Sequence, residues 1–544
     1  MRVRTVFILL VSTVLALVAT VALDTSTATS AGGRGFSAVP LRPAAAAALK
    51  AQGRTLRFPF PNAINQGRKF APGGDLVGPL NTASRQRVLV LFVDFTTPPP
   101  GGPASRLDLK IYFDSMLFGT KYDAPEFRAS GVAYPTDRTL FNYYKAVSYG
   151  QVDVVTLNLP SRLGWASSGH PYDYYCKADG IHDYGWGGYP YNVQGLVVDA
   201  IKAVDGLVDF SQYAIDGEVP NLFVVHAGTG AEWNSDPSII WSHSWSLDAY
   251  TPLSDGFWAD GVKINSYAMM PEVGGDLTGV FGGSGPYPPT VGVYAHEYGH
   301  VLGLPDQYDY GYESEGTSIY SLMAGGSWNQ WPGSDAVFSG NSPSFLDAWS
   351  RYRLGFVVPT EITSTQSVIL PPAEIAPVVY KMVVPYSGGK EYFLFENRQQ
   401  IGFDQGLNVY RDTIAGRDVR GLAIYHIDDV VLSRNYWRPN EAENWKEFRS
   451  EGWKPAANGE SHYGISILQA DGLWDLEHGL FTRFRSDLYP GTGGVTSFGS
   501  FTSPNSTSYY FWGGSAPKFG YSGVTATEIS EARGTIRARL GFVK

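Results

Sequence analysis

One helix-forming stretch carries more structural information than any other part of this sequence: Thr290-Val-Gly-Val-Tyr-Ala-His296-Glu297-Tyr-Gly-His300-Val-Leu-Gly303-Leu-Pro-Asp306. Thr is a good N-cap residue, and the pattern predicts a helix over 290–302. On such a helix His296 and His300 are four positions apart, so their imidazoles project from one face. Glu297 lies one position along, beside that face. The two histidines can therefore bind one Zn²⁺ through two nitrogens, while Glu297 reaches zinc-bound water rather than the metal.

Gly303 and Asp306 complete this pattern. A helix commonly ends at a glycine in the left-handed conformation, and the chain can then turn back sharply. That turn would bring Asp306 under the metal as a third ligand. Three protein ligands leave one position for water, as catalytic zinc requires. We therefore predict a catalytic zinc site made of His296, His300 and Asp306, with Glu297 as the catalytic residue.

A methionine turn supports this prediction. Ser321-Leu-Met323-Ala-Gly-Gly-Ser-Trp328 follows the helix, as a methionine-containing turn does in metzincins, and Met323 would form an apolar floor below the metal. The alternative is a core methionine that fills a gap beside a glycine turn.

The composition excludes several classes of protein. With 544 residues the chain should form two or more domains, and 44% hydrophobic with 17% charged residues excludes a disordered polyelectrolyte. A net charge of -10 argues against a nucleic-acid partner, because phosphate binding needs a basic surface. The single cysteine, Cys176, excludes an intrachain disulfide, and we expect a buried, inert thiol rather than a nucleophile.

The first residues have the order of a secretory signal. Arg2 and Arg4 precede an apolar run from Val6 to Leu23, and small residues end at Ala31. We predict that residues 1–31 are a signal peptide, that the protein is secreted to the extracellular space, and that no stable membrane association remains after signal removal. An uncleaved membrane anchor is the alternative.

Residues 32–85 form a basic segment with eight Lys or Arg and one acid, Asp75. We interpret them as a pro-segment, with a flexible linker as the alternative. A short helix is expected from Pro43 to Gln52. Asp75 is a candidate for blocking the site with its carboxylate, in the way that the aspartate of astacin-type propeptides does. Arg68-Lys69 and Arg85 are candidate maturation sites.

The remaining chain predicts an α+β fold. Buried strands are expected at Arg87 to Phe95 and at Asn221 to His226, with helices between them and another helix from Ser342 to Leu354. After residue 355 alternating strands prevail, such as Glu391 to Glu396 and Gly421 to His426. We predict a metzincin-like zincin catalytic domain over 86–358 and an all-β, sandwich-like domain over 359–544.

His296 to Asp309, together with the Met323 turn, closely resembles the immune inhibitor A family of secreted bacterial metallopeptidases, whose motif is HExxHxxGxxD. The stretches 87–95, 141–150, 225–228 and 240–245 are similar to its catalytic domain, and 392–398, 426–428 and 469–472 to the β region that follows. The resemblance implies zinc ligands at His296, His300 and Asp306 and a catalytic glutamate at Glu297. It also implies structural Ca²⁺, for which we assign no ligands.

These observations predict a secreted zinc metalloendopeptidase that hydrolyses protein or peptide substrates through a zinc-bound water activated by Glu297. The alternative function is that of a binding protein on a zincin scaffold with little or no turnover. A gluzincin would need a glutamate ligand on a later helix, which the Gly, Ser and Thr around Glu313 and Glu315 disfavour. For His226 and His243 we expect roles in strand ends or cleft walls rather than as further ligands. Several acids could bind calcium, although solvated loop carboxylates are the default: Asp205, Asp209, Asp216, Glu218, Asp428, Asp471 and Asp487.

Overall fold

The computed structural model of the chain describes residues 36–54, 85–100, 110–122, 135–249, 253–276, 284–332, 339–410, 418–442, 463–482, 484–510, 512 and 520–543. These residues belong to one compact unit. The predicted signal peptide, Asp75 and Arg68-Lys69 lie outside the described residues. Among the helices in those ranges, none combines the length and the apolar character that crossing a membrane requires.

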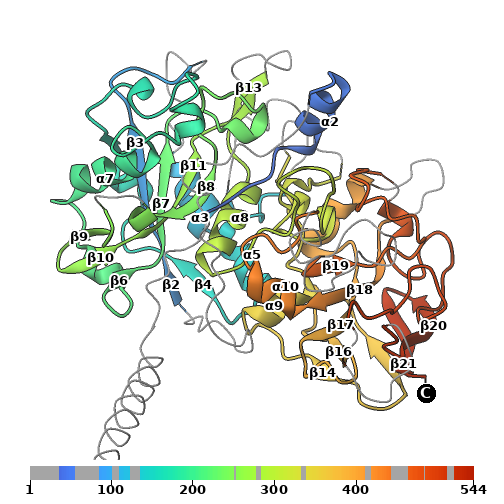
Figure 1. The fold of residues 1–544 in the computed structure, drawn as a ribbon. Coiled ribbons are helices and arrows are strands. Elements are labelled where there is room, and N and C mark those ends of the chain that lie inside the picture. Colours follow the sequence, from blue (N-terminus) through green and yellow to red (C-terminus); the bar gives the residue numbers. More distant parts are fainter. Residues whose placement is uncertain are drawn as a thin grey trace, which may run out of the picture. The chain divides into compact units, whose positions relative to one another are not determined.

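A mainly parallel sheet forms the centre of the first half of the fold (Figure 1). Its strand order is β1-β8-β11-β7-β3-β5, where β3, β5, β7 and β11 run parallel and β8 runs antiparallel to β11. The bounds are β1 Ser37–Ala38, β3 Leu89–Asp94, β5 Trp165–Ser167, β7 Leu222–His226, β8 His243–Ser246 and β11 Ser266–Pro271. The two predicted apolar strands are thus confirmed as the neighbours β3 and β7.

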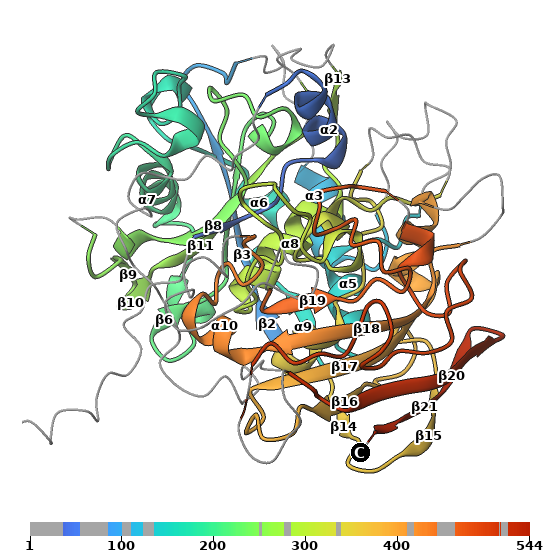
Figure 2. The same ribbon diagram turned by 45° about the vertical axis from the view of Figure 1, so that its right-hand side comes forward.

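Helices cover both faces of this sheet. Val90 and Phe92 of β3 belong to a core cluster with side chains of α3, α5 and α8, while Leu89 and Leu91 belong to a second cluster with α7. The alternation follows from the pleat of a strand, which sends successive side chains to opposite faces. Figures 1 and 2 show α7 on one side of the sheet and α3, α5 and α8 on the other. The helix bounds are α3 Lys110–Phe118, α5 Leu140–Val147, α7 Val193–Val204 and α8 Val291–Val301.

Shorter elements surround this layer. The small sheets are β6-β10-β9, β12-β13 and β2-β4. Their bounds, with those of two helices, are α2 Pro43–Ala51, β2 Arg85–Arg87, β4 Asp153–Val155, α6 Pro160–Leu163, β6 Glu218–Val219, β9 Phe257–Ala259, β10 Val262–Ile264, β12 Gly274–Asp276 and β13 Ser284–Tyr287. Helix α2 agrees with the predicted helix of the basic segment.

Two further sheets build the C-terminal part, with the orders β14-β16-β17-β18-β19 and β15-β21-β20. A core cluster joins side chains of both sheets, for example Phe393 and Ile424 from the first and Ile536 and Leu540 from the second. The bounds are β14 Thr360–Glu361, β15 Gln366–Leu370, β16 Tyr380–Val383, β17 Glu391–Arg398, β18 Gly421–Asp428, α10 Asp429–Arg434, β19 Ile465–Ile467, β20 Val524–Ala532 and β21 Thr535–Phe542. The mixed helical and stranded content agrees with the predicted α+β class.

One apolar core continues across residue 358. The cluster that contains α8 also includes Tyr392, Tyr425 and Ile465 from the C-terminal part. Buried charges reinforce the junction, because Arg351 of α9 (Ala348–Arg353) and Arg398 of β17 both contact Glu396. The boundary between 358 and 359 therefore stays a prediction.

The helix predicted from Ser342 to Leu354 is shorter than expected. Helix α9 begins only after Asp347, whose carboxylate accepts a hydrogen bond from the Ser350 N–H at 2.9 Å and caps the helix. The hydroxyl of Ser342 instead donates to the Phe403 carbonyl at 2.8 Å. The Ser-Pro pair therefore makes a tertiary contact rather than a helix start.

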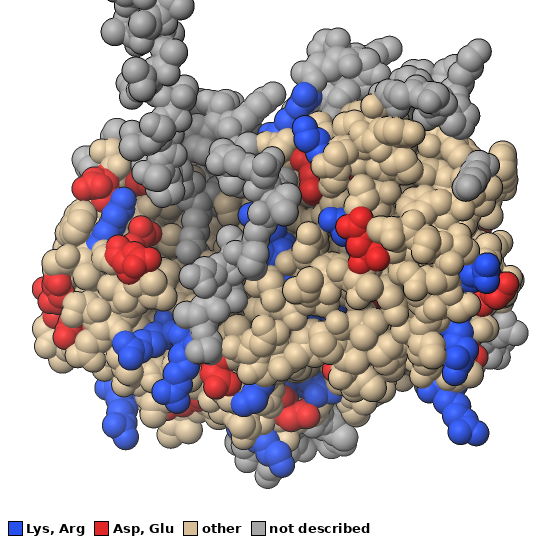
Figure 3. Space-filling view, turned by 90° about the horizontal axis from the view of Figure 1, so that it is seen from below, with Lys and Arg blue, Asp and Glu red and all other residues tan. Residues whose placement is uncertain are grey.

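Charges of both signs mix on the surface. On the face drawn in Figure 3, Lys and Arg lie among Asp and Glu, and most of the residues between them are uncharged.

Candidate metal centre

Helix α8 presents the motif histidines from a buried position. Every residue from Val291 to Val301 is buried, and Thr290 precedes the first turn as predicted. The Thr290 hydroxyl, however, donates to the Ser339 carbonyl at 2.6 Å and makes no capping bond to the helix. Gly303 follows the helix with a φ of 97°, in the region that favours glycine. This turn sends the chain back towards the helix, as the sequence predicted.

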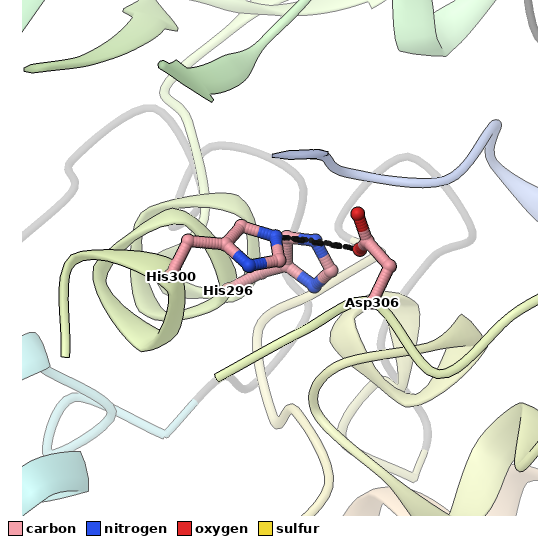
Figure 4. A group of neighbouring side chains, drawn as sticks. All are labelled: His296, His300 and Asp306. Carbon is pink, nitrogen blue, oxygen red and sulfur yellow. Dashed lines mark hydrogen bonds and ion pairs between the residues drawn. The ribbon is translucent and has the colours of Figure 1, made fainter. Parts of the chain in front are cut away.

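The turn brings Asp306 to the two histidines (Figure 4). The Nε2 atoms of His296 and His300 are 3.0 Å apart, and the Asp306 Oδ1 lies 3.2 Å from the first and 3.3 Å from the second. Within the described residues, this is the one group of three or more His, Cys, Asp or Glu side chains arranged to hold a metal ion. We call these three residues the ligand cluster.

The hydrogen bonds around the histidines favour a cation. Each Nδ1 donates to a main-chain carbonyl at 2.8 Å, Leu322 for His296 and Leu304 for His300. A neutral imidazole with a protonated Nδ1 exposes a lone pair at Nε2, which is the form that binds a metal. Tetrahedral zinc with bonds of about 2.0 to 2.1 Å separates its ligand atoms by about 3.3 Å. The ligand cluster has this spacing, so its residues fit zinc.

Asp306 is fully buried. Burial by itself would raise the pKa of this carboxyl group, and His300 and His296, when protonated, would lower it to about 2. Its Oδ2 accepts a hydrogen bond from the Tyr310 hydroxyl, whereas Oδ1 faces the histidines without a hydrogen-bond donor. A buried oxygen in that position is costly unless a cation or a donor compensates it. Asp306 is therefore suited to bind a metal through Oδ1.

Glu297 lies beside the ligand cluster and belongs to no ion pair there. Burial, and then the neighbouring Asp306 carboxylate, raise its pKa well above the ordinary value for glutamate. Its Oε1 accepts a hydrogen bond from the main-chain N–H of Val39 at 2.9 Å, and Oε2 has no hydrogen-bond partner. Its position next to the ligands is the one expected of a carboxylate that moves protons rather than binds metal.

Met323 packs beneath the helix that carries the histidines. It is fully buried, and a Cβ atom placed on Gly299 would lie 2.5 Å from its sulfur. Gly299 therefore lets Met323 approach the helix between the two histidine positions. This packing agrees with the predicted apolar floor.

The N-terminal segment of residues 36–42, which we call the cleft segment, lies across this site. Its strand β1 pairs antiparallel with β8, with Ser37 opposite Ser244 and Ala38 opposite His243. In Figure 4 the pale blue ribbon of this segment passes beside the three ligand side chains. Of the strands in this sheet, β8 would otherwise be at the edge. An extended peptide thus completes the sheet at the metal centre.

The peptide bond between Ala38 and Val39 lies at the centre of the site. The Ala38 carbonyl oxygen is 3.2 Å from the His296 Nε2 and accepts a hydrogen bond from the Tyr308 hydroxyl at 2.9 Å. The Val39 N–H points to Glu297. One end of this peptide bond therefore faces the ligand cluster and the other faces the carboxylate.

Main-chain contacts continue on the carboxyl side of that bond. The indole N–H of Trp241 donates to the Val39 carbonyl at 2.9 Å, and that of Trp328 donates to the Pro40 carbonyl at 2.8 Å. The Leu41 N–H donates to the Tyr312 hydroxyl at 2.9 Å. These hydrogen bonds are made to main-chain groups, so they depend little on which side chains the bound segment carries.

An aromatic pocket holds Phe36 on the amino side. Its ring is 5.1 Å from that of Trp245, 5.5 Å from that of Trp186 and 5.6 Å from that of His243, measured between centroids. Phe36 is 6% exposed. Such ring contacts add to the apolar area that is buried, so Phe36 is a strong anchor of the cleft segment.

The other residues considered as site candidates do not join the ligand cluster. Cys176 is buried, and burial raises the pKa of its thiol well above the ordinary value, as expected of an inert cysteine. His226 donates through Nδ1 to the Ala227 carbonyl, and His243 contacts the Trp241 carbonyl and the Tyr267 hydroxyl. Glu315 pairs with Lys50 at 3.6 Å.

No three acids in the described residues approach one another closely enough for a shared calcium ligand set, so structural calcium stays a prediction.

The tyrosines at 308, 310 and 312 and the cleft segment were not predicted. Three tyrosines at alternate positions directly after Asp306 were a visible signal. The amino-acid sequence of residues 36–42 does not indicate that they lie across the ligand cluster.

Comparisons with known proteins agree with this geometry. Residues 86–355 match the family described as immune inhibitor A peptidase M6, catalytic domain. Immune inhibitor A of Bacillus thuringiensis subsp. alesti is 30% identical over 280 residues, which cover 45% of this chain and 36% of that protein. The pre-pro-metalloprotease PrtV of Vibrio cholerae serotype O1 is 34% identical over 148 residues, 26% of this chain and 14% of the relative. The matches thus span about a third or less of these relatives. From the match and from the ligand cluster within it, we conclude that residues 86–355 are a catalytic domain of the immune inhibitor A family of metallopeptidases.

Proposed function

We propose that this protein is a secreted zinc metalloendopeptidase that hydrolyses peptide bonds in proteins, with His296, His300 and Asp306 as zinc ligands and Glu297 as the catalytic residue. One observation carries the proposal. The bond between Ala38 and Val39 has its carbonyl oxygen 3.2 Å from the His296 Nε2 and its N–H 2.9 Å from the Glu297 Oε1. A peptide bond in this orientation offers its carbonyl to a metal and its nitrogen to a proton donor.

The residues of the chain divide the reaction between them. Zinc, when bound, would polarise the carbonyl under attack and lower the pKa of water to about 7. Glu297 takes the proton of the attacking water and passes it to the nitrogen of the leaving amine, the atom that its Oε1 already reaches in Val39. Neighbouring strand β8 would hold the substrate extended through main-chain pairing, as it holds β1. Because water is the attacking group, the mechanism needs no covalent intermediate.

The same contacts support latency. The Ala38 carbonyl faces the ligand cluster, where catalytic zinc must keep one position open for water. The Val39 N–H holds Glu297, and the Ala38 N–H contacts the Asp306 Oδ2 at 3.2 Å. We infer that the basic segment 32–85 is a pro-segment whose residues 36–42 block the cleft. The block uses main-chain groups, so it does not require the Asp75 carboxylate.

The finer fold assignment is also a proposal. A catalytic domain over 86–358 of metzincin type is supported by the antiparallel edge strand β8, by the helix with both histidines and by the Met323 packing. A sandwich-like domain over 359–544 is supported by the shared core of the two C-terminal sheets. Export of the protein is supported by the signal-like order of residues 1–31, in which Arg2 and Arg4 precede an apolar run.

A binding protein without turnover is the less favoured function. Glu297 is present, buried and within hydrogen-bond distance of a main-chain nitrogen. A scaffold kept only for binding would not need this carboxylate. Protein or peptide substrates are the partners that the extended cleft segment indicates.

A comparison of the wild type with Glu297→Gln tests the catalytic assignment. Both proteins also carry Phe36→Ser in the cleft segment and Leu49→Ser in α2, which weaken the binding of this region. They are loaded with zinc, checked for equal zinc content, and assayed with casein. We expect the Glu297→Gln protein to lose about 10²- to 10⁴-fold in kcat. Equal activity of the two proteins would show that the assignment of Glu297 is wrong.

Latency is tested in the full chain without the Glu297 change. Phe36 and Leu49 are buried anchors of the segment and of α2, so replacing both with Ser should raise the activity on casein by at least about tenfold. Lys50→Ala is the matched control, because the ion pair of Lys50 with Glu315 is partly exposed and contributes about 1 kcal/mol or less. Unchanged activity in the Phe36 and Leu49 variant would contradict a blocking role.

A further inference from the structure

Three tyrosines at alternate positions follow the third ligand: Tyr308, Tyr310 and Tyr312. The rings of Tyr308 and Tyr310 stack at 4.8 Å, and those of Tyr308 and Tyr312 lie 6.2 Å apart. The stack alone could be ordinary core packing. Their hydroxyl groups, however, reach three different groups around the metal centre, which packing does not require.

Tyr308 contacts the oxygen on which negative charge would develop. Its hydroxyl donates to the Ala38 carbonyl at 2.9 Å, and the same oxygen lies 3.2 Å from the His296 Nε2. Because the adjoining Val39 N–H faces Glu297, this carbonyl has the orientation of the bond to be cleaved. A donor placed at a developing oxyanion stabilises the transition state more than the substrate.

Tyr310 contacts the ligand rather than the substrate. Its hydroxyl donates to the Asp306 Oδ2, while Oδ1 faces both histidines. Outer hydrogen bonds of this kind orient a metal ligand and select which oxygen binds. Tyr310 therefore acts as a positioning residue that reserves Oδ1 for the metal.

Tyr312 contacts the main chain of the bound segment. Its hydroxyl accepts a hydrogen bond from the Leu41 N–H at 2.9 Å, three residues beyond Ala38. This contact does not depend on the side chain at that position. It would align any extended substrate on the carboxyl side of the bond.

We propose that the three hydroxyl groups have separate roles in the reaction: Tyr308 is a catalytic residue that stabilises the oxyanion, Tyr310 positions the ligand Asp306, and Tyr312 aligns the substrate main chain. This inference rests on the proposed peptidase function. It extends that function by assigning a role to each tyrosine.

The test removes one hydroxyl at a time in the full-length, zinc-loaded chain that carries the weakened cleft segment. Tyr308→Phe should lower kcat about 10²-fold. It should weaken the binding of a phosphinic peptide inhibitor, which resembles the tetrahedral transition state, by a similar factor. KM and zinc content should stay within about twofold of the parent. Tyr294→Phe is the matched control, because this buried hydroxyl on α8 donates to the Pro271 carbonyl of β11 rather than to a metal ligand or to the cleft segment.

The other two variants have different readouts. Tyr310→Phe should raise the zinc dissociation constant about 10- to 100-fold, measured by competition with a chelator, and saturating zinc should restore most of kcat. Tyr312→Phe should raise KM for peptides that extend three residues beyond the cleaved bond and leave shorter peptides unaffected. These separate signatures would distinguish division of roles from a general loss of packing.

The outcomes also separate this inference from the proposed function. An active parent with an unchanged kcat in Tyr308→Phe would overturn the role of Tyr308 and leave the peptidase function standing. A fall of zinc content and kcat together in Tyr308→Phe would likewise overturn it in favour of a structural role. A parent no more active than its Glu297→Gln form would instead refute the peptidase function, and the catalytic role of Tyr308 with it.

The Phe36 pocket supports a second, independent inference. Phe36 lies two residues before Ala38 and directly before the paired residue Ser37, and its ring contacts those of Trp245, Trp186 and His243. If a substrate lies as the cleft segment does, the same pocket receives its side chain at that position. The geometry points to substrates with an aromatic residue two positions before the residue whose carbonyl is attacked.

Peptide pairs that differ only at this position test the pocket. We expect about 10- to 100-fold higher kcat/KM for Phe than for Ala, because the pocket buries the whole ring. Trp186→Ala should reduce this ratio several-fold, whereas Trp258→Ala, which changes a tryptophan that is 54% exposed on β9, should not. An equal ratio in the parent and in Trp186→Ala would overturn the inference.

Discussion

Two clusters of buried polar side chains in this protein differ in how their atoms are paired. In the arginine cluster, made of Arg351, Glu396, Arg398 and Asp404, opposite charges contact one another directly. Burial by itself would lower the pKa of Arg398, but Asp404 and Glu396 raise it well above its ordinary value. In the ligand cluster, lone pairs of two imidazoles and one carboxylate converge, and Asp306 Oδ1 lacks a hydrogen-bond donor.

The difference teaches how to distinguish a structural cluster from a binding site. Buried charges that compensate one another hold two parts of a fold together, as the arginine cluster joins α9 to β17. Convergent acceptors without compensation destabilise the protein until a cation binds. Burial alone does not separate the two cases, because both clusters are buried.

The largest expected effect comes from removing the metal. Chelation should abolish hydrolysis, and added Zn²⁺ should restore it and stabilise the fold by about 2.7 kcal/mol at a hundredfold excess over the dissociation constant. In zinc-free protein, His300→Leu should not lower the free energy of unfolding, since it removes one of the convergent acceptors. Denaturant unfolding with and without zinc measures both effects. A marked loss of stability in zinc-free His300→Leu would contradict the conclusion that the ligand cluster is uncompensated without a metal.

The arginine cluster should respond in the opposite way. Arg398→Met leaves Asp404 buried without its cation and Glu396 with Arg351 alone, so we expect a loss of about 3 to 5 kcal/mol that zinc does not repair. The control is Arg420→Met, because the pairs of Arg420 with Asp418 and Glu531 are partly exposed and contribute about 1 kcal/mol or less. Equal losses in the two variants would contradict the assignment.

Buried histidines outside both clusters make the next prediction. Burial lowers the pKa of His226 to about 4, against about 6.5 in an unfolded chain. The folded state thus binds fewer protons between these values. Stability is full above pH 6.5 and falls by up to about 3 kcal/mol as the pH drops towards 4.

His226→Leu should remove this contribution and reduce the slope of the unfolding free energy between pH 6.5 and 4 by about half. The remaining slope comes from His243, whose pKa burial also lowers to about 4. The measurement is the free energy of unfolding in urea at several pH values. An unchanged slope in His226→Leu would mean that His226 is protonated or exposed in the native protein.

The smallest effect is expected at Met323. Met323→Leu keeps the volume and the apolar character of the floor beneath α8, so it should cost less than about 1.5 kcal/mol and leave zinc affinity unchanged. Gly299→Ala should cost more, because its Cβ would meet the Met323 sulfur. Thermal unfolding with zinc titration checks both variants, and a large loss of zinc affinity in Met323→Leu would assign the sulfur more than a packing role.

The sequence predicted those features that depend on nearby residues. The helix of His296 and His300, the turn at Gly303 and the approach of Asp306 all follow from the spacing of residues within one short stretch, and α2, β3 and β7 follow from local patterns. Helix α9 was predicted too long because Ser342 makes a tertiary contact that no local rule contains. The cleft segment was missed for the same reason, since Ala38 and Asp306 are 268 positions apart.

What the sequence determined by itself is the chemistry of the site: two imidazoles and a carboxylate at metal-ligand spacing, with a glutamate beside them. Helical geometry places the two imidazoles and Glu297 whatever surrounds them, and the turn at Gly303 returns Asp306 to them. Only the tertiary structure decided which main chain lies across the site, which tyrosine hydroxyls face it, and which buried charges are compensated. These features depend on contacts between distant segments, and such contacts form only when the sheet and both cores are assembled.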